Sequence, residues 1–298
     1  MKQRWSLATI LLIALALTAC SGQQQTQTKK AYLGGTSGVT AGFEAFGVEE
    51  NGVFSIFNTE SFPIELTLKN KGEYEIQPRD VSVRLLGPAP AEFSGIASRE
   101  LQNQQAMDRI SELSPDGGEE TITFGRDVKY LSAIAGVIDR EWFANIEYKY
   151  QTYGLVPEVC LKEDLTDKRI CDVKQAKEFF VSGAPVTITK VEEDTAGRGI
   201  MALKFTIKNV GGGDVTKMGE EFGVHDLIAY SFDDSAWECK SGGRVNEARL
   251  IEDQAEIVCK LKQPLQKNDL FTKQVKLTLE YKYRSIIQEK LRIKESAR

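Results

Sequence analysis

The chain contains one short phrase twice, and this internal repeat constrains its fold more than any other feature. LTLKNKGEYEI occupies positions 66 to 76, and FTIKNVGGGDV occupies positions 205 to 215. In both copies apolar and polar residues alternate up to a Lys-Asn pair, and a glycine follows. Alternation with a period of two indicates a strand with one face toward a core, and Asn and Gly favour a turn at the end of the strand.

A second pair of matching segments indicates a duplication. NIEYKYQT at positions 145 to 152 matches TLEYKYRS at positions 278 to 285. The two matches occur in the same order, with offsets of 139 and 133 residues, which small loop insertions and deletions would explain. A repeat of this length is too long for a solenoid and predicts two copies of one domain. The alternative is chance similarity between unrelated strands.

Each copy reads as a series of short strands between Gly, Pro and Asn turns. This pattern predicts an all-β fold of two tandem Ig-like antiparallel β-sandwiches. Helical spacing is only local, and it predicts short surface helices at residues 98–113 and 172–180. The expected strands are residues 39–46, 62–69, 80–86, 121–124 and 142–150 in the first copy, and 185–191, 200–208, 227–232, 255–261 and 271–283 in the second.

The first twenty residues predict export. Lys2 and Arg4 precede an apolar run from Leu7 to Leu17, which is typical of a secretory signal and too short for a comfortable transmembrane helix. The following tetrad, Leu17-Thr18-Ala19-Cys20, resembles the lipobox of prokaryotic lipoproteins. That resemblance implies that Cys20 becomes the mature N-terminus, carries a diacylglycerol and anchors the protein to a membrane. The alternative is an ordinary cleaved signal with a chance cysteine.

The segment after Cys20 is rich in Gln, Thr, Ser and Gly, which bury too little apolar area to fold. It predicts a tether that reaches roughly 20–24 Å from the lipid. The predicted layout is a signal peptide (1–19), a lipidated cysteine with a flexible tether (20–36), a first sandwich (37–155) and a second sandwich with a disulfide-braced connector (156–298). The folded domains are expected outside the cytoplasmic membrane, in the cell envelope.

The four remaining cysteines are consistent with an oxidising compartment. Cys160, Cys171, Cys239 and Cys259 allow three pairings. We favour nearest-neighbour disulfides, Cys160 with Cys171 and Cys239 with Cys259, because they close short loops, each contributing roughly 3 kcal/mol. A four-cysteine zinc site is the competing interpretation, but the sequence has no C-x-x-C pair.

The charge balance argues against nucleic acid as a partner. The chain has 38 Lys and Arg against 43 Asp and Glu, a net charge of -5, and the acidic excess is spread along the sequence. Binding to nucleic acid or anionic lipid requires clustered Lys and Arg. A mildly acidic, mixed surface needs no explanation beyond solubility.

The sequence lacks a convincing set of catalytic residues, so we expect a protein that is not an enzyme and has no cofactor. The single histidine, His225, adjoins Asp226, but neighbours on a strand point to opposite faces. GGTSG at positions 34 to 38 places Ser37 one position late for a nucleophile elbow. The glycines at 211–213 lack the Lys and Ser/Thr of a phosphate-binding loop.

Acidic and aromatic residues leave two alternatives open. The carboxylates at 119–120, 192–194, 220–221 and 233–234 lack the spacing of a calcium loop and are expected to be solvated, although carboxylates from separate loops can share a calcium ion. The aromatic residues are expected to pack in the cores, with a sugar-stacking surface as the alternative. These residues are Trp142, Tyr148, Tyr150, Trp237, Tyr281 and Tyr283.

A strand that ends in K-N-x-G resembles the Ig-like and CARDB-like modules of prokaryotic surface proteins. Together with the lipobox, this resemblance implies a surface lipoprotein of the bacterial or archaeal envelope that acts in binding, adhesion or structure, with a protein or polysaccharide partner. One alternative is a subunit or accessory of a larger surface assembly such as a filament. Another is a hydrolase of envelope polysaccharide, which would need two carboxylates in a cleft.

Overall fold

The computed structural model describes residues 31–167, 169–173 and 176–297 of the protein. Strands make up 58% of the chain and helix 1%, so the prediction of an all-β fold is confirmed. Within the described part, the one helical element is a single 3-10 turn, η1 (Pro90–Glu92). All ten strands expected from the alternating pattern are present, although several extend beyond their predicted bounds.

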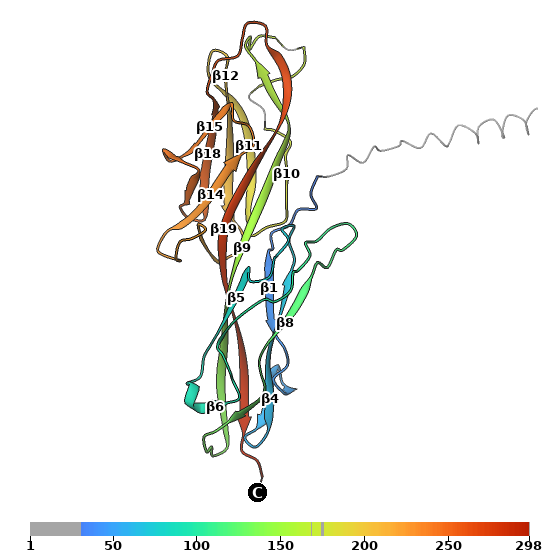
Figure 1. Ribbon diagram of the computed structural model, residues 1–298, viewed down its shortest axis with the longest axis vertical. Coiled ribbons are helices and arrows are strands. Elements are labelled where there is room, and N and C mark those ends of the chain that lie inside the picture. The colour runs from blue at the N-terminus through green and yellow to red at the C-terminus, as the bar shows by residue number, and fades with distance from the viewer. Residues whose placement is uncertain (1–30, 168, 174–175, 298) are drawn as a thin grey trace, which may run out of the picture. The chain divides into compact units, whose positions relative to one another are not determined.

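The strands form three sheets (Figure 1). The four-stranded sheet has the order β1 (Val39–Phe43), β4 (Ser61–Asn70), β8 (Glu119–Tyr130) and β6 (Phe93–Ser94). The five-stranded sheet has the order β11 (Val186–Gly197), β12 (Ile200–Asn209), β18 (Gln254–Leu261), β15 (Trp237–Ser241) and β16 (Arg244–Val245).

The third sheet has ten strands and provides the second layer for both smaller sheets. Its main path is β17 (Glu247–Leu250), β14 (Asp226–Phe232), β19 (Leu270–Lys294), β9 (Val137–Lys162), β5 (Val81–Leu86) and β7 (Glu100–Gln102). Off this path, β10 (Phe180–Val181) pairs with β9, β13 (Asp214–Thr216) and β3 (Val53–Phe57) pair with β19, and β2 (Val48–Glu50) pairs with β3.

Aromatic contacts join the layers into two sandwiches. The rings of Phe93 and Trp142 lie 5.1 Å apart between the four-stranded and ten-stranded sheets. The rings of Phe205 and Phe232 lie 6.0 Å apart between the five-stranded and ten-stranded sheets. We call the sandwich that contains the four-stranded sheet the first sandwich, and the one that contains the five-stranded sheet the second sandwich.

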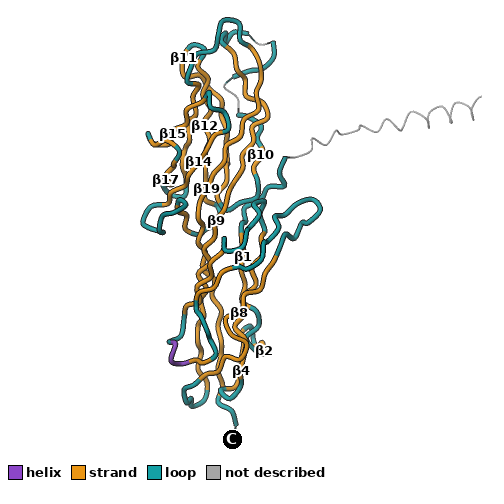
Figure 2. The backbone as a smooth tube through the Cα atoms, in the orientation of Figure 1, coloured by secondary structure: helices purple, strands orange, loops and turns teal. Residues whose placement is uncertain are grey.

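The two longest strands run through both sandwiches. β9 has 26 residues and β19 has 25, and they pair antiparallel from Lys162 opposite Leu270 to Val137 opposite Lys294. Figures 1 and 2 show them side by side along this length. At 3.2–3.4 Å per residue such a strand spans roughly 85 Å. The first part of β9 and the last part of β19 belong to the first sandwich. The last part of β9 and the first part of β19 belong to the second sandwich.

The repeated phrase occupies the same place in the two sandwiches. β4 lies between β1 and β8, with Leu66 opposite Ile122, and β12 lies between β11 and β18, with Phe205 opposite Ile257. Leu66 and Phe205 are therefore equivalent residues of two structural copies. The same equivalence relates β5 to β14, β7 to β17 and β9 to β19, in the same chain order.

The match between NIEYKYQT and TLEYKYRS marks the centre of this relationship. Tyr148 lies opposite Tyr283, and Tyr150 lies opposite Tyr281. Between these two pairs Lys149 lies opposite Lys282. An approximate twofold axis that exchanges β9 with β19 therefore passes through this point, which we call the waist.

The predicted boundary between residues 155 and 156 falls inside β9. Residues on both sides of it belong to one compact unit, Ala31–Arg298. Gly154 and Pro157, beside this boundary, fit within the strand for specific reasons. A side chain on Gly154 would collide with Ile188, and Pro157 lies at a β-bulge, where the register shifts between Lys273 and Val275.

The helix predicted at residues 98–113 is wrong. Glu100–Gln102 forms β7, and Met107 bridges Ile76 in extended conformation. Asn103 explains the difference, because its buried side chain accepts the Val81 N–H and donates to two backbone carbonyls. Such side-chain bonds compete with helix formation. The described residues of 172–180 also form no helix, and Ala176 bridges Glu192 in the second sandwich.

Both predicted disulfides are present. Cys160–Cys171 closes a loop at the end of β9, within the second sandwich rather than between the sandwiches. Cys239 and Cys259 lie directly opposite each other on β15 and β18. Nearest-neighbour pairing is thus confirmed, and these four cysteines are not available to hold zinc.

The predicted signal peptide, Cys20 and most of the tether lie outside the described residues. Among the residues that are described, no helix has the length and apolar character needed to cross a membrane.

Candidate functional site

Two buried asparagines organise the waist. Asn70 and Asn209 are the Asn residues of the repeated K-N-x-G, and both are buried. The Asn70 amide nitrogen donates to the carbonyl oxygens of Tyr74, Met107 and Asp108, at 2.7–3.2 Å. The Asn209 amide nitrogen donates to the Gly213 carbonyl at 2.7 Å. Each Asn therefore satisfies the backbone of the loop that follows its strand.

Each asparagine also joins its loop to a tyrosine of the long strands. The Tyr150 hydroxyl donates to Asn70 Oδ1 at 3.5 Å, and the Tyr283 hydroxyl donates to Asn209 Oδ1 at 3.4 Å. The glycine two positions later is required in both copies, because an added Cβ would collide with the same hydroxyl. The repeated phrase thus encodes a turn fastened to the shared strands.

A third polar group fastens the beginning of the described chain to the waist. The Glu73 side chain is 8% exposed, and its two oxygens accept the N–H groups of Leu33 and Gly34, each at 2.9 Å. Its Oε2 also accepts the Gly183 N–H at 2.7 Å. One buried carboxylate therefore holds the end of the predicted tether and the connector into the second sandwich. We call these contacts the Glu73 clamp.

A groove of about 260 Å³ opens at the waist between β1 and β19. Tyr148 and Tyr283 line it, and burial raises the pKa of both phenols, so they stay neutral at physiological pH. The groove offers apolar walls and hydroxyl groups, with no charged side chain among its lining residues. These are Thr36, Ser37, Gly38, Val39, Thr40, Ala41, Tyr148, Pro185, Gly211, Tyr283, Ser285 and Ile287.

A larger hollow of about 700 Å³ lies at the far end of the second sandwich. Three connections enclose it: the loop after β9, the β11–β12 turn and the loop before β19. Arg198 pairs with Glu163 at 2.9 Å, and hydrogen bonds from Thr166 lower the pKa of Asp164. Its lining residues are Glu163, Asp164, Leu165, Thr166, Thr195, Gly197, Arg198, Lys267 and Asn268.

Buried groups hold the wall of this hollow in place. Lys162 is almost fully buried, and its Nζ donates to the carbonyls of Asp167 and Cys171 at 2.9 and 3.0 Å. The Cys160–Cys171 disulfide closes the same loop. The hollow is therefore lined mostly by polar residue types, and a disulfide closes the loop beside it.

The structure does not bring the candidate catalytic residues together. The His225 ring is exposed, with Arg249 Nη2 2.8 Å from its Nδ1. Asp226 instead accepts the Val215 N–H. Ser37 lies in the wall of the waist groove, beside Gly38.

The acidic clusters are used in pairing. Glu119 pairs with Lys69, Glu193 with Lys177, Glu220 with Lys217 and Asp234 with Lys273. Within the described ranges, no group of three or more His, Cys, Asp or Glu side chains is placed to hold a metal ion.

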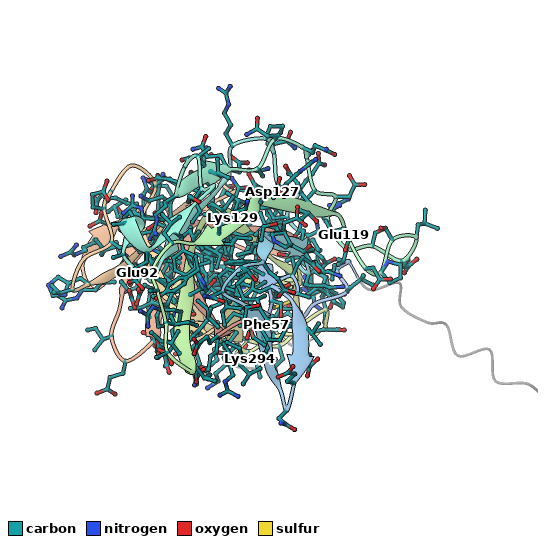
Figure 3. The ribbon with its side chains drawn as sticks, turned by 90° about the horizontal axis from the view of Figure 1, so that it is seen from below. Phe57, Glu92, Glu119, Asp127, Lys129 and Lys294 are labelled. Atoms are coloured by element: carbon teal, nitrogen blue, oxygen red, sulfur yellow. A yellow bond between two sulfur atoms is a disulfide. The ribbon has the colours of Figure 1, made fainter. Side chains whose placement is uncertain are left out.

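The aromatic residues predicted for the core are buried. Trp142, Tyr148, Tyr150, Trp237, Tyr281 and Tyr283 are all at most 4% exposed, so their rings cannot stack on a sugar. Exposed aromatic surface is found elsewhere. Phe57 lies at the end of the first sandwich that is farthest from the waist. The Lys294 ammonium is 4.8 Å from the centroid of the Phe57 ring (Figure 3).

Sequence reasoning missed the Glu73 clamp and the hollow, because both depend on loops that meet only in the folded chain. The repeated K-N-x-G and the match between NIEYKYQT and TLEYKYRS were the signals that marked the waist. No protein-family model and no curated protein matches this sequence.

Proposed function

We propose that the protein is a lipid-anchored component of a prokaryotic cell envelope, which presents a stiff β-structure to a protein or polysaccharide partner and performs no catalysis. The observation that carries this proposal is the Glu73 clamp. It fixes Leu33 and Gly34, at the end of the predicted tether, at the waist. An anchor on Cys20 would then hold the molecule by its middle, leaving both ends free to make contacts.

Two further observations support the proposal. The pairing of β9 with β19 makes one continuous sheet through both sandwiches, so a hydrogen-bonded strand pair, and no single-chain linker, connects them. Two disulfides favour an oxidising compartment outside the cytoplasm. A stiff element with recognition loops at its ends suits a binding or spacing role.

The hydrolase alternative gains no support from the hollow. Its two carboxylates are already engaged, Glu163 with Arg198 and Asp164 with Thr166. No aromatic side chain lines it to bind a sugar ring. The alternative of a filament subunit would need a strand edge long enough to pair with a neighbour. β7, β16 and β17 have two to four residues each, but β11, which ends the path of the five-stranded sheet, has twelve, so this alternative stays open.

Anchoring is tested by expressing the full chain and a Cys20→Ser variant in a bacterium with labelled fatty acid. We expect label and membrane fractionation for the unaltered chain, and neither for the variant. Equal membrane retention of the two, without label in either, would contradict the proposal. The Cys239→Ser/Cys259→Ser double variant is the matched control, because it removes cysteines that the structure assigns to a disulfide and should keep the label.

A further inference from the structure

One section of β19 has a partner strand on only one side. On the side away from β9, β13 pairs with residues 282–284 and β3 pairs with residues 291–294. Between them, residues 285–290 pair with β9 alone. We call this stretch the open section.

Hydrogen bonds at both ends of β19 show which backbone groups face the open side. The Lys276 carbonyl accepts the Asp233 N–H, and the Lys294 carbonyl accepts the Asn58 N–H, so even-numbered residues face away from β9. In the open section these are Ile286, Gln288 and Lys290. The Lys290 N–H donates to the Glu289 side chain, whereas no hydrogen bond within the described residues uses the Ile286 and Gln288 groups on this side.

The equivalent section of β9 is occupied by the chain itself. The offset of 133 residues makes Tyr153 equivalent to Ile286, and Leu155 equivalent to Gln288. In β9, Leu155 lies opposite Phe180 of β10. The Tyr153 carbonyl accepts the Ser182 N–H at 2.9 Å, and the Tyr153 N–H donates to Ser182 Oγ at 2.8 Å. One copy of the fold thus contains an extended antiparallel segment at a position that is unfilled in the other.

Apolar surface accompanies these free backbone groups. Ile286 is 62% exposed on the outer face of β19. Ser285 and Ile287 point to the other face, where they line the waist groove with Val39 and Ala41. An incoming strand would cover Ile286 with one row of side chains and place the alternate row over the groove.

The flanking strands determine what can enter. β13 and β3 extend the sheet by one strand spacing, about 4.8 Å, on either side of the open section. The open section is therefore recessed. A second copy of the protein has the same two flanking strands. If two copies approached edge to edge, these strands would collide before the two open sections came within hydrogen-bonding distance.

We propose that the open section binds an extended segment of about six residues from a partner protein, antiparallel to β19 and with apolar residues at alternate positions. This inference rests on the proposed function, in which a partner at the envelope supplies the segment. β10 and the residues that flank it, Phe179-Phe180-Val181-Ser182, serve as the internal example of an extended segment at this position.

The test is amide hydrogen exchange of the full chain in detergent, with the peptide KEFFVSG (residues 177–183) as the probe. Without peptide, we expect Ile286 and Gln288 to exchange much faster than Tyr153 and Leu155. With saturating peptide, exchange at Ile286 and Gln288 should slow by about tenfold or more, as expected for amides that gain a hydrogen bond. The control peptide is N-methylated at the residues corresponding to 180 and 182, which removes its strand-pairing N–H groups.

A matched pair of variants tests the location. Ile286→Asp should weaken peptide binding by about tenfold or more, because it places a charge against the incoming apolar residues. Ile170→Asp should leave binding unchanged, because Ile170 is 59% exposed beside the Cys160–Cys171 disulfide, and Cys160 lies opposite Thr272 at the other end of β19. Unchanged exchange at Ile286 and Gln288 with peptide, or equal binding of the N-methylated peptide, would overturn the proposal.

The same measurement on Cys20→Ser separates this inference from the proposed function. The open section does not depend on the lipid, so the peptide should bind both forms equally. Peptide binding without membrane anchoring would refute the anchor alone, whereas anchoring without peptide binding would refute the docking site alone.

Discussion

The Tyr150 hydroxyl donates a hydrogen bond to Asn70 Oδ1, at 3.5 Å. Tyr283 makes the same bond with Asn209 at 3.4 Å in the second sandwich. In each case the asparagine ends a strand of a smaller sheet, and the tyrosine belongs to a long strand of the ten-stranded sheet. This relationship explains why the chain contains K-N-x-G twice: the motif fastens each sandwich to the strands that both share.

Replacing Asn70 with Ala should destabilise the protein strongly. The change removes the acceptor of the buried Gly72 N–H and the donor to the Tyr74 carbonyl, whereas the Met107 and Asp108 carbonyls and the Tyr150 hydroxyl keep other partners. Unsatisfied buried groups cost about 1–3 kcal/mol each, so we expect a loss of at least about 2 kcal/mol in the free energy of unfolding. Urea denaturation followed by circular dichroism measures it. Lys208→Ala, an exposed change beside Asn209, should cost less than about 0.5 kcal/mol. Equal effects of the two changes would refute this role for Asn70.

Gly72→Ala should also be destabilising, although no positive φ is required there. An added Cβ would collide with the Tyr150 hydroxyl and lie 2.5–2.6 Å from two backbone oxygens, those of Ser37 and Gly183. We expect a loss of about 2–3 kcal/mol, as for overpacked cores. Gly42→Ala is the control, because a Cβ at that position meets no atom within 4 Å. Similar unfolding midpoints for the two variants would show that the waist is looser than described.

Alkaline pH should unfold the protein cooperatively. Burial raises the pKa of Tyr148, Tyr150, Tyr281 and Tyr283 above the ordinary value of 10.0. The unfolded chain therefore releases these protons first, so the stabilisation is complete below pH 10 and falls as the pH rises beyond it. Each buried tyrosine contributes a slope of roughly 1.4 kcal/mol per pH unit.

Tyrosinate absorbance and circular dichroism, recorded together, check this expectation. These phenols should ionise only as the strand signal disappears. Reversible ionisation of all nine tyrosines near pH 10 in a protein that keeps its native spectrum would contradict it.

Removing the Cys160–Cys171 disulfide should loosen the end hollow while sparing the waist. Changing both cysteines to Ser should cost roughly 3 kcal/mol and speed amide exchange in the loop after β9. Exchange at Tyr150 and Tyr281 should remain slow, because the pairing of β9 with β19 does not involve the disulfide. Uniformly faster exchange along both strands would contradict this separation.

Much of the fold could be predicted because alternation is a local signal. Leu66, Phe205 and their neighbours identified their strands, and the repeated K-N-x-G identified equivalent turns. The expected end of the strand at residue 150 was wrong, because β9 continues through Gly154 and Pro157, residue types that usually interrupt strands. Here the chain uses them for close packing against Ile188 and for a bulge.

The remainder depends on contacts between residues distant in sequence. β3 pairs with the end of β19, more than 230 residues later in the sequence. The few apolar residues of β3 give no indication of this distant partner. The Glu73 clamp likewise joins residues 39 to 110 positions apart. Such contacts leave no periodic signal in the sequence.

The most direct test of the shared-strand architecture is urea denaturation with one fluorescent reporter in each sandwich. Trp142 is buried in the first sandwich and Trp237 in the second, so Trp237→Phe and Trp142→Phe variants of the chain from residue 20 onward each report on one of them. Because β9 and β19 belong to both sandwiches, we predict one cooperative transition, with each reporter's midpoint coinciding with that of circular dichroism in the same variant. Two transitions in the circular dichroism of either variant, with its tryptophan reporting only one, would show that the sandwiches unfold independently and would contradict the account.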